Sequence, residues 1–106
     1  MIIGIPTDDG IVVSEHFGRS GMFLIADVDG GKVASNAIVE NPHNKEEKEQ
    51  SGHGKLLKML VEHKVNRVVC SNLNPRMQQN LESVGISVDR CGVDSSIEKI
   101  LEVLSR

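Results

Sequence analysis

Aromatic side chains are almost absent from this chain of 106 residues, which has two phenylalanines and neither tryptophan nor tyrosine. Nucleic-acid bases would therefore find few rings on which to stack. The formal net charge of -3 also provides no basic surface for the phosphate backbone. We predict that the protein does not bind nucleic acid.

Cysteine and long apolar runs are scarce too. Cys70 and Cys91 are the two cysteines and lie too far apart for a Cys-x-x-Cys motif, which favours reduced thiols over a disulfide framework. The first residues lead directly into an apolar, strand-like run without a basic leader, and no segment is long and apolar enough to span a membrane. We therefore expect no signal peptide, no membrane span and a cytoplasmic location.

The first half of the chain has the pattern of β-structure. A buried strand is predicted over Ile2–Ile5 with a stop at Pro6, followed by a turn over Thr7–Gly10 and a short β-like run over Ile11–Val13. Two long strands, Met22–Val28 and Lys32–Glu40, flank Asp29-Gly30-Gly31 and predict an antiparallel hairpin. The polar segment 41–50 predicts a surface loop.

The second half alternates between helix and strand. Helices are expected to begin at Ser51 or Gly52, after the N-cap Asn74, and at Ser95, which has capping-box spacing to Glu98. Buried strands are expected over Arg67–Ser71 and Ile86–Val88. The helix positions predicted to face the core are Leu56, Leu57, Leu60, Val61, Met77, Leu81, Val84, Ile97, Ile100, Leu101 and Leu104.

These elements predict a single α/β domain over residues 1–106. An antiparallel meander comes first and βαβ units follow, so helices would cover a mixed five-stranded sheet in three layers. Ligands in such sheets bind beyond the carboxyl ends of the parallel strands. The loop after the first strand, the Ser51–Gly54 turn and the Ser71–Pro75 turn are expected to meet there.

Two short segments contain the residues best suited to bind a ligand. In the loop around His16-Phe17-Gly18-Arg19, an imidazole can ligate a metal, glycine admits close approach and a guanidinium can neutralise an anion. The Gly52-His53-Gly54 turn is expected to offer free backbone N–H groups at a helix N-terminus. Both segments also have an ordinary interpretation, as a turn with an exposed histidine and as a plain helix start.

The remaining histidines and cysteines have structural interpretations. His63 suits the negative end of a helix dipole, and His43 is expected to be a solvated loop residue that could close over a ligand. Cys70 lies within an apolar strand and is predicted to be a small core residue, whereas Cys91 could be exposed in a turn.

The ordered set of motifs resembles the dinitrogenase iron-molybdenum cofactor biosynthesis family. The resemblance covers nearly the whole chain and rests on His16-Phe17-Gly18-Arg19, Phe23–Asp27, Asn41-Pro42, Gly52-x-Gly54, Val68–Pro75 and Gly85-Ile86. It implies a ribonuclease-H-like fold. It also implies a carrier or binding domain for a metal-sulfur cluster, or for an iron-molybdenum cofactor precursor, because family members and the related orange proteins hold such clusters.

The resemblance and the chemistry of the side chains together give a set of site residues. The cofactor-binding residues would be His16, Phe17, Gly18, Arg19, Gly52, His53 and Gly54, with His16 and His53 as metal ligands, although His53 matches no ligand position of the family. The cofactor would be an iron-sulfur or molybdenum-containing sulfide cluster, and the partners would be that cluster or its precursor and cluster-assembly proteins. The alternative is a metal-free interaction or regulatory module of the same fold.

An enzymatic function is not expected. Two-metal nuclease chemistry needs several carboxylates converging on the sheet, and the first strand contains none. Asp8 and Asp9 are explained as turn formers, and no Gly-x-Ser-x-Gly nucleophile motif occurs.

Overall fold

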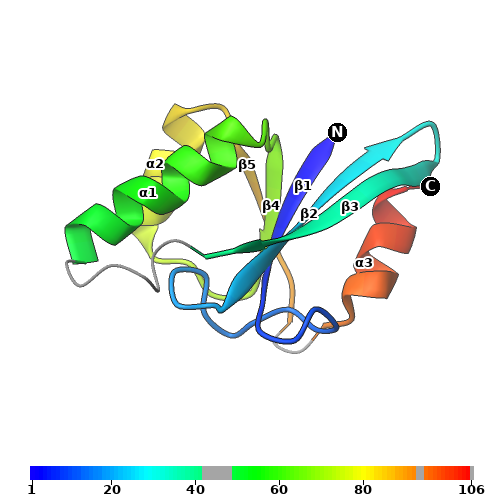
Figure 1. Ribbon diagram of the computed structural model, residues 1–106, viewed down its shortest axis with the longest axis horizontal. Helices are drawn as coiled ribbons and strands as arrows, with labels where there is room; N and C mark the ends of the chain where they lie inside the picture. The colour runs from blue at the N-terminus through cyan, green and yellow to red at the C-terminus, as the bar shows by residue number, and fades with distance from the viewer. Residues whose placement is uncertain (42–48, 93–94, 106) are drawn as a thin grey trace.

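A mixed five-stranded sheet lies at the centre of the computed structural model, which describes residues 1–41, 49–92 and 95–105, with only the backbone described over 49–54. The elements are β1 (Ile2–Thr7), β2 (Met22–Asp29), β3 (Lys32–Glu40), α1 (Glu49–Glu62), β4 (Arg67–Cys70), α2 (Pro75–Ser83), β5 (Ser87–Arg90) and α3 (Ile97–Leu104) (Figure 1). The strand order is β3-β2-β1-β4-β5. Strand β1 pairs antiparallel with β2 and parallel with β4, as the predicted meander and βαβ units require.

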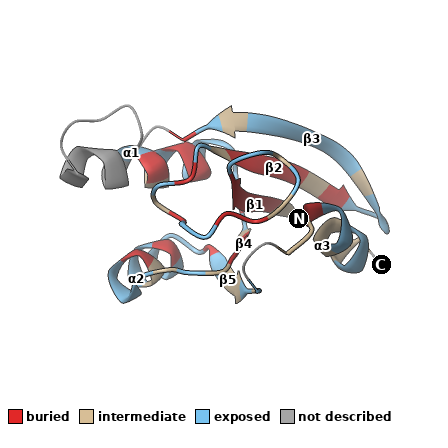
Figure 2. Ribbon diagram, turned by 90° about the horizontal axis from the view of Figure 1, so that it is seen from below, coloured by how far each residue is buried: buried red, intermediate tan, exposed pale blue. Residues whose placement is uncertain are grey.

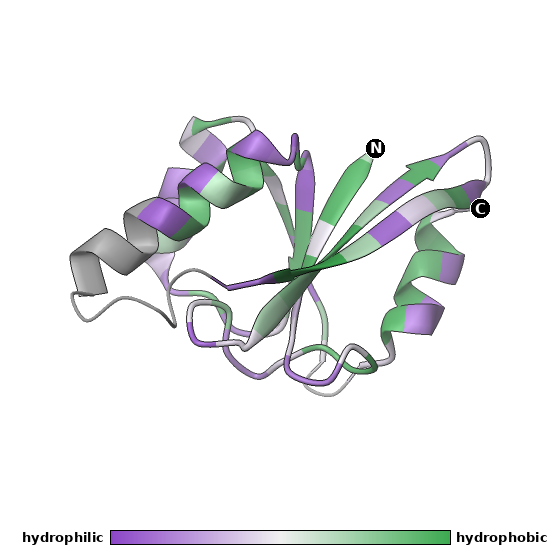
Figure 3. Ribbon diagram, viewed as in Figure 1, coloured by the Kyte–Doolittle hydropathy of each residue, from purple (hydrophilic) through white to green (hydrophobic). Residues whose placement is uncertain are grey.

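Alternation along the strands produces two apolar layers. Phe23 and Ile25 of β2 join a core with residues of α1 and α2 on one face of the sheet. Leu24 of β2 and Ile3 of β1 join a second core with α3 on the other face. Figure 1 shows α1 and α2 on one side of the strands and α3 on the other, and in Figure 3 the hydrophobic residues of α3 lie on the side nearer to the sheet. The predicted three-layer arrangement is therefore confirmed.

Helix α2 follows the prediction at both ends. The Asn74 side chain accepts a hydrogen bond of 2.7 Å from the backbone N–H of Met77, Pro75 occupies the first helical position, and Gly85 beyond the helix has a φ of +83°. Val84, however, is the C-cap residue and is 44% exposed, so its predicted place on the buried face is wrong.

The starts of the other two helices differ from the prediction. Helix α1 begins at Glu49 rather than at Ser51 or Gly52, because glycine within a helix costs only about 1 kcal/mol and packing of Leu56, Met59 and Leu60 can offset that cost. Met59, rather than the exposed Val61, completes the buried face of the helix.

Helix α3 is capped by Ser96 rather than Ser95. The backbone carbonyl of Ser95 accepts a hydrogen bond from Val13 (2.9 Å), so Ser95 lies before the helix. The Ser96 side chain instead accepts from the backbone N–H of Lys99, at 3.4 Å.

The end of β1 also differs from the prediction. The strand continues through Pro6 to Thr7, beyond the two positions at which it pairs with β4. Proline is tolerated there because no hydrogen bond from its nitrogen is needed. Val12 and Val13 form isolated bridges to Ser96 and Thr7 rather than a strand. Among the described residues, no helix has both the length and the hydropathy needed to cross a membrane.

Candidate functional site

Two loops meet at the carboxyl ends of the neighbouring parallel strands β1 and β4. Residues 8–21 follow β1, and residues 71–74 follow β4. The side-chain amide of Asn72 donates a 2.9 Å hydrogen bond to the backbone carbonyl of Glu15. The predicted convergence of these two loops is therefore confirmed. They meet between β1 and β4, with β2 and β3 on one side and β4 and β5 on the other, and α/β domains commonly bind ligands at such a switch point.

The His16 loop, residues 14–21, alternates between exposed and buried residues. The side chains of His16 and Arg19 are exposed, and Gly18 is partly buried. Phe17 is 4% exposed, and its ring packs edge-on against Phe23 of β2 at a centroid distance of 5.2 Å. Phe17 therefore anchors the loop in the core, while His16 and Arg19 are presented to solvent.

Asp8 holds both ends of the His16 loop. Its carboxylate accepts hydrogen bonds from the Ser14 hydroxyl (2.9 Å) and from the backbone N–H of Gly21 (2.8 Å). The same Ser14 oxygen accepts from the backbone N–H of His16, at 3.1 Å. Asp8 is thus more than the turn former that we predicted, since it connects the two ends of the loop.

Asp9 is a turn former, as predicted. Its carboxylate accepts backbone N–H hydrogen bonds from Ile11 (2.8 Å) and Val12 (3.1 Å). These bonds lower the pKa of the Asp9 carboxyl, which therefore remains ionised at neutral pH.

The Asn41 side chain holds the His16 loop in place by hydrogen bonds from the protein interior. This side chain is fully buried, and its amide nitrogen donates to the backbone carbonyls of Ser20 (2.9 Å) and Gly18 (3.3 Å) and to the Ser20 hydroxyl (3.3 Å). Sequence reasoning noticed Asn41 only as part of a motif. The available signal was a polar residue directly after a long predicted strand. When such a residue is buried, its polar groups must find hydrogen-bond partners, so it can hold a neighbouring segment in place.

The Gly52-His53-Gly54 segment lies inside α1 and not before it. In an α-helix, only the first four N–H groups lack a partner within the helix. Because α1 begins at Glu49, the N–H groups of His53 and Gly54 lie beyond the first four of the helix. The prediction that these two groups are free is therefore wrong. The structure describes no side chain over 49–54, so ligation by His53 stays a prediction, and His43 lies outside the described residues.

The donor set of the described residues does not fit a bare metal ion. Nowhere in residues 1–41, 55–92 and 95–105 do three histidine, cysteine, aspartate or glutamate side chains gather as a metal site. A structural zinc site needs four protein ligands. A metal-sulfur cluster supplies its own sulfides, so an exposed imidazole and a nearby guanidinium fit a cluster better than a single ion.

Cys70 is not available as a ligand. Its side chain is fully buried in the core beneath α1 and α2, and this burial raises the pKa of the Cys70 thiol to about 11. The prediction that Cys70 is a core residue is confirmed. Cys91, at the end of β5, is partly exposed.

We expect iodoacetamide at pH 8 to modify Cys91 at least about tenfold faster than Cys70, because burial denies access to Cys70 and suppresses its thiolate. Mass spectrometry of digested samples over time measures both rates. In the Cys91→Ser variant the folded protein should remain nearly unmodified, and urea should restore labelling. Equal rates in the folded protein would contradict the burial of Cys70.

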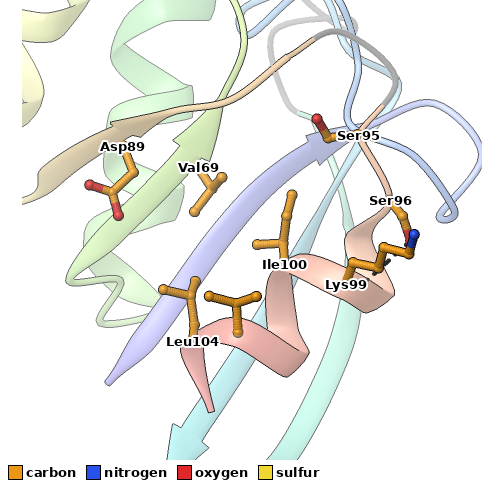
Figure 4. A pocket seen from close by; sticks show the side chains of 8 residues that line it. Val69, Asp89, Ser95, Ser96, Lys99, Ile100 and Leu104 are labelled. Atoms are coloured by element: carbon orange, nitrogen blue, oxygen red, sulfur yellow. Dashed lines mark hydrogen bonds between the residues drawn. The ribbon is translucent and has the colours of Figure 1, made fainter. Parts of the chain in front are cut away.

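A cavity of about 660 Å³ lies apart from the His16 loop, between α3 and strands β4 and β5 (Figure 4). Its lining residues are Val69, Asp89, Ser95, Ser96, Lys99, Ile100, Val103 and Leu104. None of them is a residue that we predicted to bind a cofactor. The lining mixes apolar side chains with two serines, an aspartate and a lysine, a combination that suits an amphipathic molecule better than a metal-sulfur cluster.

The whole chain, residues 1–106, matches the model of a protein family described as dinitrogenase iron-molybdenum cofactor. The chain belongs to this family. The resemblance drawn from the His16 loop and the later motifs is thereby confirmed.

Similar proteins agree with this membership. The chain is 33% identical to a protein of known crystal structure, PH0822, with a TM-score of 0.83, and the match covers 99% of this chain and 88% of that one. An uncharacterized protein of Methanocaldococcus jannaschii, MJ0580, is 27% identical over 96% of this chain and 86% of its own length. The apo form of the orange protein from Desulfovibrio gigas is 18% identical, with a TM-score of 0.78, over 97% of this chain and 85% of that one. The last likeness shows the shared fold.

Proposed function

We propose that this protein is a small carrier or binding domain for a metal-sulfur cluster or an iron-molybdenum cofactor precursor. The observation that carries this proposal is the exposed His16 on a loop held by Phe17, Asp8 and Asn41. Because these contacts already fix the loop, His16 can bind a metal with little further loss of conformational entropy. A surface histidine without a function needs no such fixed loop. Membership of the iron-molybdenum cofactor family supports the same conclusion.

The roles of the site residues follow from their chemistry. His16 would supply an imidazole nitrogen to a metal of the cluster, and Arg19 would attract its negative charge. Gly18 would let the backbone approach the cluster. Phe17, which we predicted to bind the cofactor, would instead position the loop, because its ring is buried against Phe23. The His53 side chain keeps its proposed part as a second metal ligand. A contact through the backbone N–H groups of His53 and Gly54 is not part of the proposal, because these residues lie within α1.

The wider predictions belong to the same proposal. The cluster or its precursor is the cargo, cluster-assembly proteins are the partners, the protein is not an enzyme and it acts in the cytoplasm. We also propose the ribonuclease-H-like classification of the fold, which the strand order β3-β2-β1-β4-β5 supports.

We expect His16→Ala to weaken binding of a reconstituted iron-sulfur or molybdenum-sulfur cluster by roughly tenfold or more, because the variant loses a ligand. The free energy of unfolding should change by only about 0.5 kcal/mol, since the side chain is exposed. Anaerobic titration followed by visible absorbance, with metal and acid-labile sulfide analysis, measures the binding. His63→Ala is the matched control because it removes another exposed imidazole, beyond the end of α1.

The outcomes separate the two functional classes. Cluster bound by the parent and by His63→Ala, but poorly by His16→Ala, supports the carrier. Equal binding by all three proteins excludes His16 as an essential ligand. If the parent is colourless after anaerobic purification and takes up neither iron, molybdenum nor sulfide, the carrier is excluded and the metal-free interaction module is the better account.

A further inference from the structure

We propose that the cavity between α3 and strands β4 and β5 binds a small organic monoanion with an apolar body, such as a medium-chain carboxylate. The cavity has a volume of about 660 Å³, within the range of about 300 to 1,000 Å³ that is usual for small-molecule sites. None of its lining residues belongs to the His16 loop. The proposal therefore does not depend on whether the protein binds a cluster.

The cavity forms because one helix covers only part of this face of the sheet. Helices α1 and α2 both pack on the opposite face, whereas α3 is the described helix that packs on this one. The core beneath α3 is built mainly from β1 and β2, to which β4 adds Val69. Figure 2 accordingly shows β1 and β2 mostly buried, while the residues of β5 are at most partly buried. The sheet beside α3 thus becomes a wall of the cavity.

The middle of the cavity is apolar. Figure 4 shows Val69 and Ile100 between Lys99 on one side and Asp89 on the other. Val69 is 4% exposed, and Ile100 is a partly buried residue of the same core. Val103 of α3 also lines the cavity, yet it is 59% exposed. An apolar ligand body in the cavity would cover Val103 and remove apolar surface from water, which favours binding.

The charges of the lining favour an anion. Asp89 and Lys99 are its two charged residues. The Asp89 carboxylate is paired with the Arg67 guanidinium at 3.1 Å. Within the described parts of the chain, no ion pair involves Lys99. The charge left to attract a ligand is therefore that of one lysine, which matches a single negative charge.

The other charges of α3 lie away from the cavity. The helix contributes residues 96, 99, 100, 103 and 104 to the lining, a spacing that defines one side of a helix. Glu98 and Glu102 are exposed and are not part of this side. Their carboxylates therefore do not line the site that Lys99 serves.

Two hydrogen-bond donors lie on the Lys99 side of the cavity. The Ser96 hydroxyl oxygen accepts from the backbone N–H of Lys99 at 3.4 Å, so its own hydrogen can be donated to a ligand. Ser95 instead donates its hydroxyl hydrogen to the backbone carbonyl of Gly92, at 2.6 Å. The Lys99 ammonium and the Ser96 hydroxyl suit the two oxygens of a carboxylate. A phosphate monoester carries about 1.5 to 2 negative charges, which one lysine would leave partly unneutralised.

A titration with two ligands of equal chain length tests the ligand class. We expect decanoate, below its critical micelle concentration and at low salt, to shift the amide NMR signals of Val69, Ser96, Lys99 and Ile100 in a saturable way. Decyltrimethylammonium has the same chain and the opposite charge, so it should bind at least about fivefold more weakly. Equal binding of the two ligands, tighter binding of the cation, or decanoate shifts that are absent or do not saturate would overturn the proposal.

Two variants test the charged and the apolar part of the cavity separately. Lys99→Gln should weaken decanoate binding roughly fivefold and remove the preference over decyltrimethylammonium, because it removes the unpaired charge. Val103→Gln should weaken both ligands by a similar factor, roughly fourfold, because it removes apolar contact. The matched controls on α1 are Lys58→Gln and Val61→Gln, and all four side chains are exposed. Decanoate binding that is unchanged in Lys99→Gln or Val103→Gln, or equally weakened in the matching control, would reject this site.

Discussion

Asn41→Ala is expected to lower the free energy of unfolding by about 2 to 3 kcal/mol and to loosen the His16 loop. The substitution removes a fully buried amide and leaves the carbonyls of Gly18 and Ser20 without its hydrogen bonds. Buried polar groups left without a partner cost about 1 to 3 kcal/mol. Urea denaturation measures the loss, and faster amide exchange at His16 would report the loosening.

Two further variants make this prediction specific. Asn80→Ala, on the exposed side of α2, should change stability by less than about 0.5 kcal/mol. Asn41→Asp keeps the shape of the side chain but turns an acceptor towards the two carbonyls, so it should be at least as harmful as Asn41→Ala. Full stability in Asn41→Asp would show that donation by the Asn41 amide does not hold the loop.

Phe17→Ala is expected to lower the free energy of unfolding by about 3 kcal/mol and to weaken cluster binding as well. The ring is 4% exposed and packs against Phe23, so its removal leaves a cavity and releases the middle of the loop. Binding should fall because only part of the population would then present His16 correctly. Urea denaturation and the anaerobic titration measure the two effects.

The contrast with His16→Ala separates positioning from ligation. His16→Ala should lose binding and keep its stability, whereas Phe17→Ala should lose both. Phe17→Leu should recover most of the stability and binding, because leucine fills much of the same space. If Phe17→Ala destabilised the protein but bound cluster like the parent, the ring would anchor the core without positioning His16.

The local pattern around α2 shows how far sequence reasoning reaches. Asn74, Pro75 and Gly85 act through backbone groups within a few residues of themselves, so their roles as N-cap, first helical residue and C-terminal stop could be predicted. The apolar runs in β1 and β2 likewise predicted strands. Such signals are short in range and do not depend on how distant segments pack.

The sequence predicted less well which residues at the border of a helix's apolar face are buried, as Val61 and Val84 show. Both residues are apolar and were predicted to face the core, yet both are exposed. Which side of a helix meets the sheet is determined by the sheet and by neighbouring helices. The choice of Ser96 over Ser95 as the α3 cap is similar, because the carbonyl of Ser95 is engaged by Val13, far away in the sequence.

The sequence by itself determined the types and order of the elements, the family and the presence of His16 and Arg19 in one loop, because these depend on residue types and local spacing. Only the tertiary structure decided that Asp8, Asn41 and Asn72 fasten that loop and that Gly52–Gly54 lies within a helix. The hydrogen bonds of Asn41 and Asn72 join residues 21 or more positions apart in the chain. Such bonds arise from strand order and register, which no short pattern of residues specifies.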